Sequence, residues 1–120
     1  MPIFTLNNKQ FDELITHNEI VLIDFWAEWC APCKQFASIY ERVAEQNPDL
    51  KFAKVNIETE SELAENLSIR SIPHLMIFKQ GILIYSDAGA MPESMLKDLV
   101  QQAIDADVSE IRAKIDAGEI

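Results

Sequence analysis

Short runs of apolar residues along the chain predict five β-strands. The longest run, Ile-Val-Leu-Ile-Asp-Phe-Trp at residues 20–26, is almost continuously apolar, which is typical of a strand covered on both faces. Shorter runs predict further strands at residues 4–6, 52–57, 75–78 and 82–85. The last two are joined by Lys79-Gln80-Gly81 alone, and so short a link predicts an antiparallel hairpin.

Between these strands, apolar residues that recur every three or four positions predict helices. Asn7 followed by Gln10 has the form of a helix start, and a second helix begins near residue 30, where Pro32 fits the first turn. Pro48 is expected to end that second helix. The inward-facing positions predicted for these two helices are Phe11, Leu14 and Ile15, then Phe36, Ile39, Tyr40, Val43 and Ala44.

Two more helices follow in the second half of the chain. Thr59-Glu60-Ser61-Glu62 has the form of a capping box, which predicts a third helix to about residue 66. Pro92 is expected to open the last helix. The inward-facing positions predicted for that helix are Met95, Leu96, Leu99, Val100, Ala103 and Ile104.

The predicted order of elements is β-α-β-α-β-α-β-β-α. The first half alternates as parallel βαβ units do, and the second half contains the hairpin. We therefore expect an α/β fold with a mixed central β-sheet flanked by helices on both faces.

Length and charge narrow the class of protein. The chain has 120 residues, 48% of them hydrophobic, which suits one domain with one core. A net charge of −10 argues against binding nucleic acid or an anionic membrane. No stretch approaches the roughly 18 apolar residues of a membrane helix, and the first residues lack the basic start and apolar run of a signal peptide. We therefore expect a cytoplasmic protein.

The most informative chemistry lies in two cysteines, Cys30 and Cys33, three positions apart. At the start of a helix, the first of two such thiols is stabilised as a thiolate by backbone N–H groups and the helix dipole. Cys30 is therefore the expected attacking sulfur and Cys33 the resolving thiol. A zinc site would need further ligands, for which only His17 and His74 are available, so redox chemistry is favoured over metal binding or a silent core pair.

Asp24 is the one acid within the apolar run at residues 20–26. Burial should raise its pKa, which suits a proton carrier near neutral pH, although an acid at a strand end could instead reach solvent. Lys54 lies on the next predicted strand and is either a partner of Asp24 across the sheet or an exposed lysine.

Four further residues lie near the cysteines in the chain or in the predicted site, and residue type and position bear on the role of each. Trp29 directly precedes Cys30 and offers surface to a partner, whereas Trp26 is expected to pack in the core. Pro73 either begins an edge strand or follows a cis peptide bond, which the residues alone do not decide. His74 is expected to be a surface or hydrogen-bonded histidine rather than a ligand or base.

The segment Val21-Leu22-Ile23-Asp24-Phe25-Trp26-Ala27-Glu28-Trp29-Cys30-Ala31-Pro32-Cys33-Lys34 resembles the active-site segment of bacterial thioredoxins. The resemblance extends over roughly residues 3 to 106. It includes the segments Phe52-Ala53-Lys54-Val55-Asn56-Ile57, Ser68-Ile69-Arg70-Ser71-Ile72-Pro73, Phe78-Lys79-Gln80-Gly81 and Ala88-Gly89-Ala90.

This resemblance implies a thioredoxin fold and reduction of protein disulfides. Cys30 would be the nucleophile, Cys33 the resolving thiol and Asp24 the proton-transfer acid with Lys54 nearby. No cofactor would be bound, and electrons would come from NADPH through thioredoxin reductase. Disulfide-containing client proteins would bind in a groove formed by Trp29, Ala31, Pro32, Ile72, the cis-proline Pro73, Gly89 and Ala90.

Two residues depart from the family pattern at the site itself. Ala31 replaces the usual glycine between the first cysteine and the proline, and is expected to shift the relative stability of dithiol and disulfide. His74 replaces the threonine that commonly follows the cis-proline, and its ring is expected to alter the choice of partner.

Residues 107–120 extend beyond the resemblance, so we divide the chain into a thioredoxin domain at 1–106 and a C-terminal helical extension or tail. Ile104, Val108, Ile111 and Ile115 continue the helical spacing, and Gly118 would cap the longer helix. The extension could fold back, form a dimer seam, lead into a further domain or fray, and we expect a monomer with dimerisation through this helix as the alternative.

Two rival functions remain open beside the disulfide reductase. A thioredoxin-fold co-chaperone would hold clients with the groove and the C-terminal helix, although the intact cysteine pair argues against a purely binding role. An oxidase or isomerase would more often carry a histidine between the cysteines, where this chain has Ala31 and Pro32.

Overall fold

The computed structural model describes residues 3–119 and contains one mixed five-stranded sheet. The strand order is β1-β3-β2-β4-β5, in which β1, β3 and β2 are parallel and β4 and β5 are antiparallel to their neighbours. The strands are β1 (Ile3–Thr5), β2 (Ile20–Trp26), β3 (Lys51–Asn56), β4 (His74–Lys79) and β5 (Ile82–Ala88). The expected mixed sheet and its terminal hairpin are therefore confirmed.

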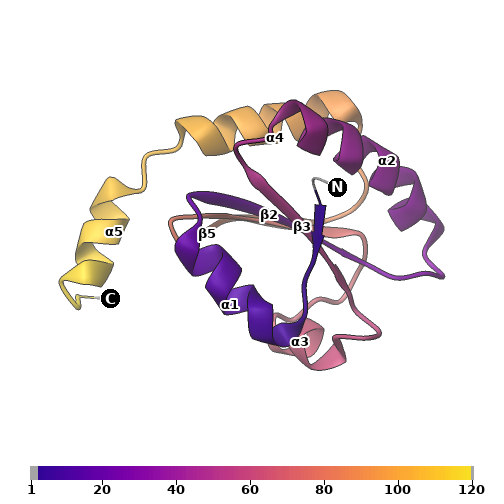
Figure 1. Ribbon diagram of the computed structural model, residues 1–120, viewed down its shortest axis with the longest axis horizontal. Helices are drawn as coiled ribbons and strands as arrows, with labels where there is room; N and C mark the ends of the chain where they lie inside the picture. The colour runs from indigo at the N-terminus through magenta and orange to yellow at the C-terminus, as the bar shows by residue number, and fades with distance from the viewer. Residues whose placement is uncertain (1–2, 120) are drawn as a thin grey trace.

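Helices cover both faces of this sheet (Figure 1). One face carries α2 (Ala31–Gln46) and α4 (Glu93–Asp105), and the opposite face carries α1 (Asn8–His17) and α3 (Ser61–Asn66). Because β2 lies in the middle of the sheet, both of its faces are covered, which explains its continuous apolar sequence.

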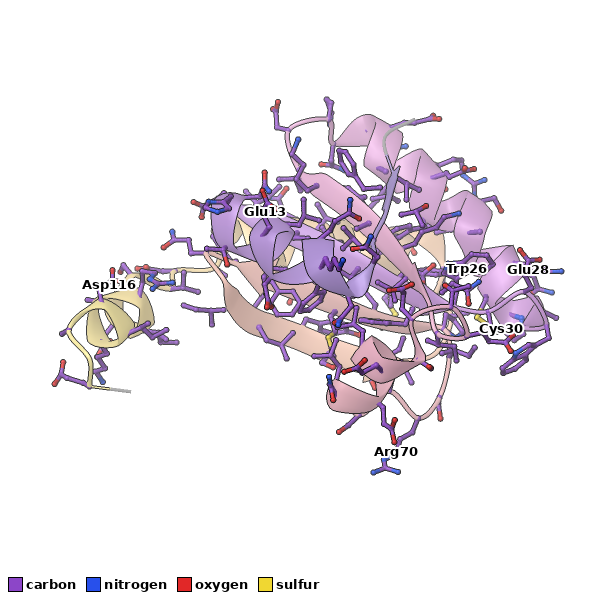
Figure 2. All side chains as sticks on the ribbon, turned by 60° about the horizontal axis from the view of Figure 1, so that its bottom comes forward. Glu13, Trp26, Glu28, Cys30, Arg70 and Asp116 are labelled. Atoms are coloured by element: carbon purple, nitrogen blue, oxygen red, sulfur yellow. A yellow bond between two sulfur atoms is a disulfide. The ribbon has the colours of Figure 1, made fainter. Side chains whose placement is uncertain are left out.

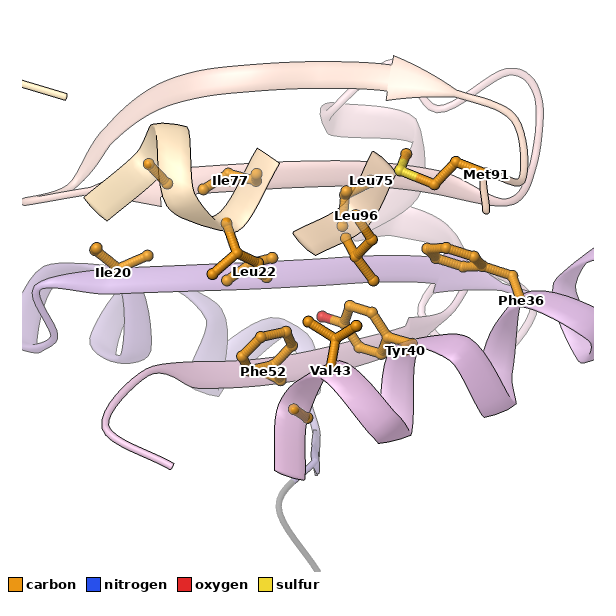
Figure 3. Packing of buried hydrophobic residues seen from close by; sticks show 13 residues of the cluster. Ile20, Leu22, Phe36, Tyr40, Val43, Phe52, Leu75, Ile77, Met91 and Leu96 are labelled. Atoms are coloured by element: carbon orange, nitrogen blue, oxygen red, sulfur yellow. The ribbon is translucent and has the colours of Figure 1, made fainter. Parts of the chain in front are cut away.

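Alternate residues of β2 pack into two different cores. Ile20 and Leu22 join the cluster beneath α2 and α4, which Figure 3 shows, whereas Val21 and Ile23 join the cluster on the α1 side. The period of two places Asp24 on the same face as Leu22, beneath α2. The strand therefore directs its single acid into the layer beneath the helix that carries the cysteines.

Of the two helix caps predicted from the sequence, one is confirmed by the structure and the other is wrong. Asn7 forms the predicted capping box with Gln10, since its side chain accepts the Gln10 N–H at 2.9 Å. The capping box predicted at residues 59–62 is wrong: Glu60 precedes the helix and makes no side-chain cap. The Thr59 hydroxyl instead donates to the carbonyl oxygen of Asn56 at 3.3 Å, so it is occupied in the turn that leads into α3.

Two residues of α4 expected in the core are largely exposed. Met95 is 51% exposed and Ile104 is 43% exposed, whereas Leu96, Val100 and Ala103 are buried. Met91, just before the helix, is buried in the core that Met95 was expected to join (Figure 3). The inward stripe of α4 is therefore narrower than its apolar spacing suggests.

The prediction that the last helix continues into the C-terminal residues is wrong. The helix α4 ends at Asp105, Ala106 has an extended backbone, and a separate helix α5 (Ser109–Asp116) follows. The buried Lys79 stabilises the end of α4, because its Nζ donates to the carbonyl oxygens of Ala103 and Ile104 at 2.8 and 2.9 Å. These are end-of-helix carbonyls, which a cation caps well.

The helix α5 ends as the sequence predicts. Gly118 has a φ of +77°, and its N–H donates to the carbonyl oxygen of Ile115 at 3.0 Å. The N–H of Glu119 donates to the carbonyl oxygen of Lys114 at 2.9 Å, which completes a Schellman motif. None of the helices within residues 3–119 has the length and apolar character needed to span a membrane.

Candidate active site

The two cysteines lie where β2 gives way to α2, at one end of the molecule (Figure 2). A disulfide joins Cys30 and Cys33, whose Cα atoms are 5.2 Å apart. Cys30 is the N-cap residue of α2, and its Sγ accepts the backbone N–H of Cys33 at 3.2 Å. A negative charge on this sulfur would be stabilised by that N–H and by the positive end of the helix dipole.

Both sulfurs are shielded from solvent, and the second is the more deeply placed. Cys30 is 5% exposed and Cys33 2% exposed, and both pack with Ala27 in a small apolar cluster. The partly buried side chains of Trp26, Ile57 and Ile72 pack against this cluster. Both cysteines are therefore enclosed by apolar side chains.

The loop before β4 faces the cysteines. The Ile72–Pro73 peptide bond is cis, as the resemblance implies, and the Ile72 carbonyl oxygen lies 3.9 Å from Sγ of Cys30. The carbonyl oxygen of Pro73 accepts the N–H of Gly89 at 2.7 Å, which brings the loop after β5 alongside. The structure therefore places Ile72 against Cys30, and Gly89 beside Pro73.

The predicted surface residues around the disulfide are open to solvent. Trp29 is 67% exposed, and Ala31 and Pro32 are also exposed at the first turn of α2. On the other side of the loop, Gly89 and Ala90 are exposed as well. Gly89 has a φ of +115°, a conformation that a side chain rarely adopts.

Asp24 is buried, with 3% of its surface exposed, and its carboxyl borders a cavity of about 220 Å³ beneath α2. Burial raises the pKa of Asp24 to about 8, and the nearby positive charge of Lys54 offsets part of that rise. The cavity is also bordered by Ala37, which lies one helical turn after Cys33 on the same face of α2. The structure therefore brings the acid beneath the helix face that carries the second cysteine.

Lys54 lies directly opposite Asp24 in the register of β2 and β3, and it borders the same cavity. The two side chains form no ion pair in the described part of the chain. The Nζ of Lys54 lies instead 5.0 Å from the centre of the Trp26 ring. Lys54 is thus a neighbouring charge for Asp24 rather than its hydrogen-bond partner.

His74 is half-buried at the start of β4, immediately after the cis-proline. Its Nε2 lies 2.8 Å from the hydroxyl of Ser86, and its ring packs edge-on against Phe25. Burial lowers the pKa of His74, and the carboxylate of Asp87 opposes that effect. The neutral ring is therefore favoured, consistent with a hydrogen-bonded histidine.

Tyr40 is the polar neighbour of the site that the sequence did not single out. The helical spacing predicts Tyr40 in the core stripe of the second helix, and its side chain is buried, with 1% of its surface exposed. Tyr40 also borders the cavity that Asp24 borders. The signal available in the sequence was its hydroxyl, because a buried tyrosine needs a hydrogen-bond partner. Within residues 3–119, no group of three or more His, Cys, Asp or Glu side chains is placed to hold a metal ion.

A disulfide at the start of a helix, faced by a cis-proline on a mixed sheet, defines a small dithiol–disulfide oxidoreductase, whose exchange chemistry needs no bound cofactor. The family model of thioredoxin matches residues 2–102, and the chain belongs to the thioredoxin family. It is a protein-disulfide oxidoreductase that carries the redox-active pair of that family.

Individual relatives agree with this assignment. The chain is 49% identical over 110 residues to "Putative thioredoxin 2" of Streptomyces coelicolor, covering 92% of this chain and 82% of that one. A mutant thioredoxin from Halobacterium salinarum superposes with a TM-score of 0.80 at 29% identity, covering 88% of this chain and 93% of that one. Plasmodium falciparum thioredoxin superposes with a TM-score of 0.77 at 35% identity, covering 82% and 97%.

Proposed function

We propose that this chain reduces disulfides of client proteins, with Cys30 as the nucleophile and Cys33 as the resolving thiol. The observation that carries these roles is the hydrogen bond from the Cys33 N–H to Sγ of Cys30, because it favours a thiolate on the first cysteine. The alternative of a client-binding co-chaperone is not favoured, because the redox pair is intact and stands at disulfide distance.

The reaction proceeds in two exchanges. The Cys30 thiolate attacks one sulfur of the substrate disulfide, forming a mixed disulfide and releasing the first substrate thiol after protonation. The Cys33 sulfur then attacks Sγ of Cys30, which breaks the mixed disulfide and releases the second substrate thiol. Two electrons pass from the protein dithiol to the substrate, and the Cys30–Cys33 disulfide is left.

In this proposal, Asp24 exchanges a proton with the Cys33 thiol during the second exchange. Because its pKa is raised to about 8, the group takes up and gives up a proton near neutral pH. As a carboxylate it accepts the Cys33 proton, and in the reverse direction the protonated acid returns it. Lys54 favours the carboxylate and so keeps part of the population ready to accept the proton.

The client peptide lies along the edge formed by the loops around the disulfide. The backbone of Ile72 pairs with the extended client chain, and Pro73 faces the reacting sulfurs. Supporting this placement, the Ile72 carbonyl lies 3.9 Å from Sγ of Cys30, and backbone at a strand start can bind a peptide as an added strand. The walls of the groove are assigned to Trp29, Ala31, Pro32, Gly89 and Ala90.

Electrons return to the disulfide from NADPH through thioredoxin reductase, and the protein works as a cytoplasmic monomer. The family membership and the acidic chain with a single cysteine pair support these assignments. The redox domain is assigned to residues 1–106 and the extension to 107–120, consistent with the end of α4 at Asp105.

The test is reduction of insulin by the purified chain with NADPH and thioredoxin reductase, followed as NADPH consumption. The account predicts turnover that depends on the chain and on the reductase together. If dithiothreitol supports insulin reduction through the chain but the reductase does not, the assigned electron donor is wrong while the disulfide chemistry stands. Failure with both donors contradicts the reductase function.

A further inference from the structure

The hydroxyl of Tyr40 is buried between α2 and the sheet, and Tyr40 is one of the residues that border the cavity shared with Asp24. Its Oη donates a hydrogen bond to the carbonyl oxygen of Ala53 at 2.8 Å, in a residue that is 1% exposed. A phenol has one hydrogen to donate and keeps lone pairs to accept with. Since its hydrogen is directed at Ala53, Tyr40 can act toward any further neighbour only as an acceptor.

The polar residue nearby that could donate a hydrogen bond toward Tyr40 is Asp24, when its carboxyl is protonated. Tyr40 and Asp24 border the same cavity of about 220 Å³, and Oδ1 of Asp24 has no hydrogen-bond partner among the described protein groups. The negative charge of ionised Asp24 adds to burial in raising the pKa of Tyr40, so the two groups are within electrostatic reach of each other. A cavity of this size also admits water, which would have polar partners on both sides.

We propose that Tyr40 is a positioning residue for proton transfer at Asp24: its hydroxyl oxygen accepts a hydrogen bond that reaches it from the protonated carboxyl through water in the cavity. An acceptor of this kind stabilises the protonated acid and disfavours the carboxylate. The proposal rests on the role assigned to Asp24 above and adds a group that sets when Asp24 holds its proton.

The other groups around Asp24 differ in charge. Lys54, across the register on β3, favours the carboxylate, and Glu41 is an exposed acid on α2 that borders the cavity. The β4 partner of Asp24 is the uncharged Leu75. Tyr40 differs from the two charged residues because it is buried and neutral, and from Leu75 because it carries a hydroxyl whose orientation is fixed by Ala53. Its contribution is therefore that of a fixed dipole, which salt does not screen.

Tyr40→Phe tests the proposal because it removes the hydroxyl and keeps the ring. The ionisation midpoint of Asp24 is followed in the oxidised protein by ¹³C NMR of the labelled aspartate carboxyl, assigned from the resonance that Asp24→Asn removes. Loss of one net hydrogen bond should lower the midpoint by about half a pH unit to one pH unit. The pH profile of the resolving step should move in the same direction.

The matched control is Tyr85→Phe, which removes the hydroxyl of the chain's other tyrosine, on β5. It should leave the Asp24 midpoint unchanged. If Tyr40→Phe fails to fold, 3-fluorotyrosine placed at position 40 keeps the ring and the donor while weakening the oxygen as an acceptor. It should lower the midpoint in the same direction by a smaller amount.

A purely structural role for Tyr40 would lower the free energy of unfolding of Tyr40→Phe and leave the Asp24 midpoint in place. That result overturns the proposal, as would a midpoint that rises. Failure of the assigned Asp24 role has a different signature, since the wild-type midpoint would then lie near that of an ordinary aspartate.

Discussion

The backbone N–H of Cys33 donates to Sγ of Cys30 over 3.2 Å, so the second residue of the redox pair stabilises the sulfur of the first. Only the N-cap position gives a side chain this access to the free N–H groups of a helix. Cys33 lies inside the first turn of α2. Within residues 3–119, its own Sγ accepts no such hydrogen bond from a backbone N–H. The two sulfurs are chemically different although only two residues lie between them in the sequence.

Replacing the buried acid should slow one exchange and spare the other. In Asp24→Asn the attack of Cys30 on substrate should be unchanged, whereas the attack of Cys33 on the mixed disulfide should slow by about 100-fold near neutral pH. Stopped-flow single turnovers, followed by tryptophan fluorescence, separate the two steps. The control is Asp49→Asn, which changes an exposed aspartate in a loop. If both steps of the Asp24→Asn variant run at wild-type rates, the proton-transfer role is refuted.

The same acid should make stability depend on pH. The pKa of Asp24 is about 8 in the folded protein and about 3.9 in an unfolded chain, so between these values the folded state binds more protons. The free energy of unfolding therefore falls as pH rises from about 4 to about 8. Asp24→Asn should remove this fall.

Urea unfolding of the oxidised protein at a series of pH values measures the effect. Asp24→Asn should be more stable than the wild type at pH 9, by on the order of a few kcal/mol, and nearly equal to it at pH 4. Parallel curves for the two proteins across the whole range would mean that Asp24 is not desolvated in the folded state.

The buried Lys79 should contribute to stability through the end of α4. Its Nζ donates to the carbonyl oxygens of Ala103 and Ile104, which have no partner within the helix. Lys79→Met keeps the apolar stem and loses the charge, and should lower the free energy of unfolding by about 2 kcal/mol. Lys97→Met is the control, since Lys97 is exposed and its ion pair within residues 3–119 is with Glu93 on the surface.

Urea denaturation distinguishes the two variants. The change for Lys97→Met should stay within about 0.5 kcal/mol, as is usual for a surface ion pair. Equal losses for both lysines would show that the ammonium does not stabilise the helix end.

Removal of residues 107–120 should leave disulfide reduction intact, because α5 lies at the opposite end of the molecule from Cys30 (Figure 2). Stability should fall by about 1 to 2 kcal/mol because Val108, which is 5% exposed, leaves its place in the core. Insulin reduction and thermal unfolding of the shortened chain measure both quantities. A loss of activity without unfolding would assign the extension a part in client binding.

Arg112→Ala is the point mutation that complements this truncation. Arg112 Nη1 donates to the carbonyl oxygen of Gln80 at 2.8 Å and so ties α5 to the turn between β4 and β5. If that contact positions the extension, Arg112→Ala should loosen α5, seen as faster amide hydrogen exchange there, with no change in redox activity.

The central strand and the buried acid could be predicted from the sequence because their signal is local. The apolar run at residues 20–26 has no solvated face, and an aspartate inside it has no exposed position to occupy. By contrast, the spacing of Ile104, Val108 and Ile111 is the same in one long helix as in two short ones. The break is accompanied by a cap from Lys79, which lies more than 20 residues earlier in the chain, so no local pattern reports it.

The residues of the candidate site could likewise be predicted where their signal in the sequence is local. The cysteines and Asp24 stand in local patterns that predict their chemistry, whereas the cis bond before Pro73 was implied only by the family resemblance. The Lys54 ammonium lies over the Trp26 ring rather than against Asp24, and Tyr40 borders the cavity. Both arrangements depend on how α2 packs over the sheet. Such contacts between elements leave no mark on residue spacing.

The most direct test of the assigned roles is trapping with single-cysteine variants. Cys33→Ser and Cys30→Ser are each reduced, mixed with insulin and examined by mass spectrometry for a covalent adduct. The account predicts a persistent mixed disulfide through Cys30 in Cys33→Ser and no comparable adduct in Cys30→Ser, because the remaining cysteine, Cys33, is buried in the oxidised protein. Adducts that form equally fast through either cysteine would contradict the assignment of nucleophile and resolving thiol.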